Sequence, residues 1–282
     1  MTILQSAILG IVQGLAEFLP ISSSGHLEIC QHLMGLSENS SAMMLLTVLL
    51  HAGTLVAVAV VFWEDWVDIL KNLFRSKLLG LLFIASLPAL AAAVLLGDAL
   101  DSLFGSGFIG LAFLVTALFL VLTEWVSRRM QARKTPLQEE VGLRHAVIMG
   151  VMQAVAILPG VSRSGSTLLG GIASGVKREK AAKFSFMMSA PAIVGSLLFE
   201  GKDALENGYF AQLELVPTLI GMVTAAVCGY LAIRFMLKLI NKLSLNWFAL
   251  YTALLGLIIL LLQLSGFTGL PAFALPGAMP IG

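Results

Sequence analysis

The sequence predicts an all-α polytopic membrane protein: six transmembrane helices plus two re-entrant helical hairpins in an inverted-topology repeat. Three observations lead there: the scarcity of charge, the long uncharged stretches, and the clustering of the basic residues. Of the 282 residues, 58% are hydrophobic and 12% are charged, with a mean hydropathy of +0.95. Soluble domains carry roughly 25% charged residues, so a soluble globular core is strongly disfavoured.

Long uncharged stretches supply the predicted spans. A transmembrane helix needs about 20 mainly apolar residues, and after Lys242 the chain carries no charge at all. No Lys or Arg precedes Lys71, so a cleaved signal peptide is not expected. The predicted spans cover residues 42–63, 78–97, 107–126, 183–199, 214–235 and 247–264.

The basic residues set the predicted orientation. All Lys and Arg residues except Arg163 and Lys202 fall in four clusters, within residues 71–77, 128–144, 177–183 and 234–242. The other connections, near Glu38, 98–101 and 200–214, carry acids and a single base. The positive-inside rule places the basic clusters in the cytoplasm and the acidic loops outside.

Alternation of the spans leaves two segments that start and finish on one side of the membrane. Residues 145–176 lie between two cytoplasmic clusters. Their first helical stretch, 145–158, is about 20 Å long against a hydrocarbon core of about 30 Å. By the same alternation residues 1–38 begin and end outside. Each segment is therefore predicted to form a re-entrant hairpin, and the two enter from opposite faces.

The two hairpins resemble each other at an offset of 140 residues. Residues 10–13 match 150–153, and the Ser/Gly-rich residues 22–25 match 162–165. Because three spans follow each hairpin, the halves have opposite orientation, as in transporters whose broken helices meet near the midplane. Chance similarity between Gly/Ser-rich membrane segments is the alternative.

The repeat gives the predicted domain organisation. The chain is a single membrane domain, 1–282, built of the pseudo-repeats 1–126 (hairpin 1–38) and 145–265 (hairpin 145–176), with a short Pro/Gly-rich tail, 266–282.

Arg163 is the polar residue hardest to explain without a function. An arginine at mid-membrane costs about 2.5–3.5 kcal/mol on insertion scales, so it should face a cavity and hold an anion. Its planar fork suits a phosphate, and Gly160 and Gly165 let backbone N–H groups converge on one. Hydroxyl groups surround it, on Ser162, Ser164, Ser166 and Thr167. The alternative is a structural ion pair with Glu17 that positions the two hairpins.

The first hairpin supplies complementary groups. Glu17 lies one turn after Gln13 on the same helix face, and its carboxylate can bind a divalent cation or act as a base. After a break at Pro20 come three serines and His26. Ser23 and His26 are close enough to form a nucleophile–base pair or to bind a phosphate together. A core histidine with satisfied hydrogen bonds is the alternative for His26.

Other residues carry weaker signals. His51 interrupts an apolar span and is assigned to polar packing inside the bundle, and Cys30 and Cys228 are assigned to small buried hydrophobes. There is no Walker loop, no Cys/His zinc spacing and no dinucleotide fingerprint. No basic patch with interleaved aromatic residues indicates nucleic acid.

Two segments closely resemble the signatures of the bacterial undecaprenyl-diphosphate phosphatases of the bacitracin-resistance type. They are QGLAEFLPISSSGH at 13–26 and LPGVSRSGST at 158–167. The resemblance covers roughly residues 3–265. It implies hydrolysis of undecaprenyl diphosphate to the monophosphate carrier lipid of cell-wall synthesis, at the outer face of the bacterial inner membrane. It also implies bacitracin resistance, because bacitracin competes for this substrate, and a divalent cation, Mg²⁺ or Ca²⁺.

The resemblance also assigns roles to residues. By position, the family's essential residues fall on Glu17, Ser23, His26, Ser162, Arg163 and Thr167. Catalysis is expected at Glu17, Ser23, His26 and Arg163, and Glu17 is also the expected metal ligand. Because the other position of its motif holds Gln13, Glu17 is the sole carboxylate there, which speaks against chelation of the metal by two acids. The expected phosphate-binding residues are Ser162, Arg163 and Thr167, together with Gln13, Ser22 and Ser164 of the same two motifs. Ser23, His26 and a water molecule all remain open as the nucleophile. A transporter or flippase for a lipid phosphate is the alternative function, and homo-oligomerisation is left open.

Overall fold

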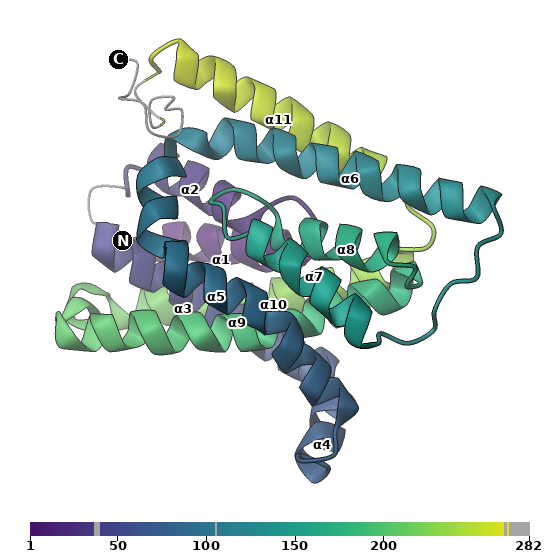
Figure 1. Cartoon of the computed structure of the whole chain (residues 1–282). Helices are drawn as coiled ribbons and strands as arrows, with labels where there is room; N and C mark the ends of the chain where they lie inside the picture. Colours follow the sequence, from purple (N-terminus) through teal and green to yellow (C-terminus); the bar gives the residue numbers. More distant parts are fainter. Residues whose placement is uncertain (37–39, 105, 268–269, 271–282) are drawn as a thin grey trace.

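The computed structural model describes residues 1–36, 40–104, 106–267 and 270 (Figure 1). Within these residues the chain forms helices and no strand. The α-helices are α1 (Ile3–Phe18), α2 (Ser23–Leu33), α3 (Ser40–Val61), α4 (Trp63–Lys71), α5 (Lys77–Phe104), α6 (Ile109–Ala132), α7 (Leu143–Val155), α8 (Arg163–Ala173), α9 (Arg178–Glu206), α10 (Leu215–Leu239) and α11 (Asn246–Leu264). Two short 3₁₀ turns, Ser106–Phe108 and Tyr209–Gln212, join the longer helices.

Six helices are long and apolar enough to cross a membrane: α3, α5, α6, α9, α10 and α11. This confirms the all-α polytopic fold and each of the six predicted spans. The largest difference is α9, which covers Arg178–Glu206 where the sequence predicts 183–199. The helix continues into the charged residues at both ends of the predicted span. A chain that leaves the hydrocarbon core keeps its backbone hydrogen bonds most simply by remaining helical. Glu38 and nearly all of the tail 266–282 lie outside the described residues.

The four remaining helices of the two hairpins are short. Helix α1 ends at Phe18, ahead of Pro20, and α7 has 13 residues, which is about 20 Å of helix. The second helices, α2 and α8, have 11 residues each. They are capped by equivalent serines, Ser22 and Ser162, whose side chains accept hydrogen bonds from the N–H of Gly25 and Gly165. Both segments are therefore helix–turn–helix pairs, and their re-entrant placement stays a prediction.

Glycines let the hairpins pack against the spans of the opposite half. A Cβ atom on Gly10 of α1 would lie 2.3 Å from the carbonyl oxygen of Gly221 on α10. One on Gly150 of α7 would lie 2.5 Å from the carbonyl oxygen of Ala85 on α5. Equivalent positions of the sequence repeat thus make equivalent helix contacts.

The two hairpins lie between two groups of spans. Figure 1 shows α6 and α11 side by side along one side of the molecule and α3, α9 and α10 on the other. Helix α1 packs on α10 and α3, while α8 packs on α6 and α9. The polar tips of both hairpins are therefore enclosed by helices.

Candidate active site

The two hairpin turns touch each other directly. The Ser164 hydroxyl donates to the Leu19 carbonyl oxygen at 3.2 Å, and the Gly160 N–H donates to the Ser24 hydroxyl at 3.3 Å. Gly160 has a φ of +82°, in the left-handed region that glycine adopts without strain. The turns thus bring together groups that lie more than 130 residues apart in the sequence.

Glu17 and Arg163 form an ion pair across this junction. The Arg163 Nη2 donates to Glu17 Oε1 at 2.5 Å, with the side chains 17% and 7% exposed. The Arg163 Nη1 donates to the carbonyl oxygen of Ser185 on α9 at 2.9 Å. The ion pair that the sequence offered as an alternative is therefore present, and it holds the guanidinium in the centre of the polar cluster.

The second oxygen of Glu17, Oε2, contacts three further polar side chains. Ser23 donates its hydroxyl to Oε2 at 2.7 Å, and the Gln13 amide donates at 3.1 Å. His51 of α3 places its Nε2 3.5 Å from the same oxygen. A carboxylate that accepts a serine hydroxyl at this distance is placed to take its proton.

The hydroxyls around Arg163 bond within the protein. Ser162 caps α8, and its hydroxyl also lies 3.3 Å from that of Ser164. Thr167 lies 2.9 Å from the Arg163 carbonyl oxygen and 2.6 Å from the Ser185 hydroxyl. They hold the first turn of α8 in shape, and this turn directs backbone N–H groups toward the junction.

His26 makes its hydrogen bonds to a different set of groups. Its Nδ1 is 2.7 Å from the Ser22 carbonyl oxygen, and its Nε2 is 2.7 Å from the hydroxyl of Tyr251 on α11. Ser22 is a buried residue with a φ of +74°, a conformation that non-glycine residues adopt at a cost of about 1–3 kcal/mol. The structure thus joins Ser23 to Glu17, and the hydrogen bonds of His26 go elsewhere.

The structure adds three residues to those singled out by sequence. His51 was assigned to packing, yet it contacts Glu17. Its only sequence signal was a polar side chain inside an apolar span. Ser185 and Tyr251 gave no signal, because their contacts join parts of the chain that only the fold brings together.

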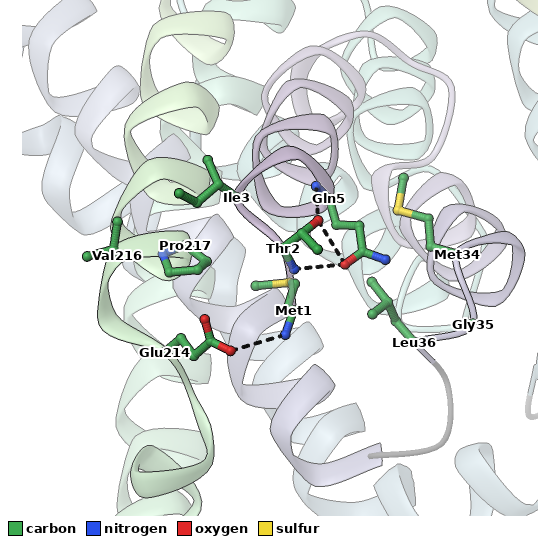
Figure 2. Close-up of a pocket in the computed structure, with 10 residues that line it drawn as sticks. All are labelled: Met1, Thr2, Ile3, Gln5, Met34, Gly35, Leu36, Glu214, Val216 and Pro217. Carbon is green, nitrogen blue, oxygen red and sulfur yellow. Dashed lines mark hydrogen bonds and ion pairs between the residues drawn. The ribbon is translucent and has the colours of Figure 1, made fainter.

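Two large hollows of the surface lie away from this cluster. One of about 630 Å³ is lined by the start of α1, the end of α2 and the start of α10. In Figure 2 the Met1 amine faces Glu214, 3.6 Å away, and Gln5 turns back to Thr2. Another of about 630 Å³ lies between α4, α5 and α9. A small cavity of about 10 Å³ lies beside Ser164 and Ser185. The side chains of the cluster are thus arranged by their contacts with one another.

Comparison with known proteins gives consistent matches over nearly the whole chain. The family model described as "Bacitracin resistance protein BacA" matches residues 6–258. An undecaprenyl-diphosphatase from Carboxydothermus hydrogenoformans is 39% identical over 264 residues, covering 93% of this chain and 98% of that protein. One from Halothermothrix orenii is 40% identical with the same coverage. Undecaprenyl-diphosphatase 3 from Bacillus cereus is 38% identical over 263 residues, again covering 93% and 98%.

Proposed function

The chain belongs to the bacitracin resistance protein BacA family, and we propose that it removes the terminal phosphate from undecaprenyl diphosphate. It is an integral membrane hydrolase whose products are undecaprenyl phosphate and inorganic phosphate. The observation that carries this proposal is the junction of the two hairpins. There one carboxylate, Glu17, contacts both a serine hydroxyl at 2.7 Å and a guanidinium at 2.5 Å.

Binding of the diphosphate begins at Arg163. Its Nη2 leaves Glu17 for a phosphate oxygen, while the bond from Nη1 to Ser185 keeps the guanidinium in place. The first turn of α8 adds backbone N–H donors. The hydroxyls of Ser162, Ser164 and Thr167 keep this turn in the binding conformation. Stabilisation of the developing charge on the transferred phosphoryl group supplies most of the rate enhancement in such reactions.

The same exchange prepares the base. Once Arg163 turns to the phosphate, Oε1 of Glu17 is released, while Oε2 keeps the Ser23 hydroxyl and is placed to take its proton. Ser23 Oγ then attacks the terminal phosphorus while its proton passes to Glu17 Oε2. A bond forms between Ser23 Oγ and phosphorus, and the bond from phosphorus to the bridging oxygen breaks. Undecaprenyl phosphate leaves with the electron pair, and water later hydrolyses the phosphoserine.

A divalent cation fits this site as a partner of the substrate. Among the residues that the structure describes, no group of three His, Cys, Asp or Glu side chains is placed to hold one. Glu17 is a single carboxylate, and the buried Gln13 Oε1 beside it has no hydrogen-bond partner. These two oxygens would hold Mg²⁺ or Ca²⁺ together with the phosphates, as is usual for Mg²⁺. When bound, the cation would neutralise charge on the diphosphate.

The site is proposed to open to the periplasmic side of the bacterial inner membrane. Support comes from the basic clusters, which the positive-inside rule assigns to the cytoplasm and which place both ends of the first hairpin outside. Bacitracin would then compete for the diphosphate lipid at the surface where the enzyme meets it.

The deciding experiment is phosphate release from a C55 diphosphate by the purified protein, followed by trapping of a phosphoenzyme. A phosphoryl group mapped to Ser23, and its loss in S23A, are expected. A phosphohistidine at His26, or inversion at phosphorus in a single step, would contradict this mechanism. Binding of the lipid without phosphate release would favour the transporter or flippase.

A further inference from the structure

Aromatic side chains from two other helices hold the His26 ring. Tyr251 of α11 stacks on the imidazole, with ring centroids 5.7 Å apart and planes inclined by 13°. Phe113 of α6 meets the ring edge-on at 5.1 Å. Phe113 reaches it because Gly25 has no side chain: a Cβ there would lie 2.8 Å from the Phe113 ring. The two aromatic rings therefore fix the position and the plane of the imidazole.

The hydrogen bonds then select the tautomer of His26. A carbonyl oxygen only accepts, so Nδ1 carries the proton and donates to Ser22. In the neutral ring Nε2 then presents a lone pair, which accepts from the Tyr251 hydroxyl. Meanwhile the Ser23 hydroxyl donates to Glu17. Two bases thus stand in the site, and only Glu17 is engaged with the serine.

Resting on the proposed function, we propose that Tyr251 is a positioning residue that reserves the Nε2 lone pair of His26 for hydrolysis of the phosphoserine. In that step a water oxygen bonds to phosphorus and the bond from phosphorus to Ser23 Oγ breaks. One water proton goes to His26 Nε2, where the water replaces the phenol hydroxyl while the stacked ring keeps the imidazole aligned. Glu17 returns its proton to the Ser23 oxygen, and His26 later releases its proton to solvent.

The Y251F variant keeps the stacking and loses the hydrogen bond. Since a hydrogen bond of this kind changes an equilibrium about fivefold, we expect Nε2 of His26 to react about five times faster with diethyl pyrocarbonate. The rate is read by peptide mass spectrometry at His26. Y230F is the matched control, because Tyr230 of α10 faces Arg234 instead, and it should label at the wild-type rate.

The catalytic readouts are the phosphoenzyme and the pH profile. On the acid limb, Y251F should accumulate phosphoserine and have a lower kcat, because a larger share of His26 is protonated there and cannot take a proton from water. The acid limb of kcat should move up by about half to one pH unit, since the phenol no longer favours the neutral ring. Around that ring α11 contributes Tyr251 and α6 the uncharged Phe113, and Cys30 of α2 is near enough to Tyr251 to interact electrostatically.

The outcomes separate this inference from the proposed function. An unchanged labelling rate at His26 in Y251F overturns the positioning role. Faster labelling without phosphoserine accumulation or a shifted acid limb overturns the assignment to the second step. Faster labelling together with no phosphate release by the wild-type protein would sink the phosphatase proposal and leave the Tyr251–His26 contact standing.

Discussion

Replacing Glu17 by Gln tests the ion pair and the base together. The amide keeps the size of the side chain but removes the charge that faces Arg163, Ser23 and His51. Removing one partner of a buried pair costs about 3–5 kcal/mol, because the other charge stays buried. The lower end, about 3 kcal/mol, is expected here, since Arg163 is 17% exposed and keeps its bond to Ser185. Loss of the general base should lower kcat by about 10²–10⁴.

A second variant separates stability from catalysis. In E17Q/R163M the unpaired buried charge is gone, so most of the lost stability should return, as buried pairs replaced by neutral residues are often close to neutral. Phosphate release should stay abolished. Thermal unfolding of the detergent-solubilised protein, followed by tryptophan fluorescence, measures the first effect, and an inorganic phosphate assay measures the second.

The matched control is another ion pair in the same chain. Asp65 of α4 lies 2.7 Å from Lys183 of α9, but these side chains are 26% and 40% exposed. Exposed pairs contribute about 0–1 kcal/mol, so D65N should change neither stability nor activity by much. If E17Q were as stable as the wild type, or if E17Q/R163M were less stable than E17Q, the buried ion pair with a role in catalysis would be refuted.

Three further predictions follow from contacts elsewhere. G14A should destabilise the protein by about 1–3 kcal/mol, because its Cβ would lie 2.6 Å from the Ala225 carbonyl oxygen. A Cβ on Gly195 would meet no atom within 4 Å beyond its own stretch of helix, so G195A should be neutral or stabilising in thermal unfolding. E124Q should lower the melting temperature with little change in kcat per folded molecule, since Glu124 pairs with Arg178 at 3.3 Å, away from the junction; a selective loss of kcat would contradict that. A chelator should reduce phosphate release and added Mg²⁺ should restore it; full activity in the chelator would remove the cation from the proposal.

The fold was largely predictable because its signals are local. Runs of about 20 apolar residues mark spans without knowledge of their neighbours, and Pro20 marks the end of α1. Helix α4 has no counterpart among the predicted elements, because residues 63–71 hold charged side chains and lie between the predicted spans 42–63 and 78–97. In the structure they form a helix that projects from the bundle (Figure 1).

Only the site residues that lie within the two sequence motifs, 13–26 and 158–167, were predictable. Glu17 and Arg163 were identified because a charge inside an apolar segment needs a partner. His51 was assigned differently, since the side of α3 that faces Glu17 depends on how the span is rotated in the bundle. Tyr251 lies 225 residues from His26, and no periodicity in α11 distinguishes its hydroxyl from that of an interfacial tyrosine. Contacts set by tertiary packing leave no mark in a local pattern.

The separation of Glu17 and Arg163 along the chain also bears on biogenesis. The acid is synthesised 146 residues before its partner. With the predicted re-entrant placement of the first hairpin, the nascent first half would enter the lipid without the cation that later neutralises the acid. Until the second half emerges from the ribosome, this carboxyl would be protonated, hydrated or sheltered by the insertion machinery.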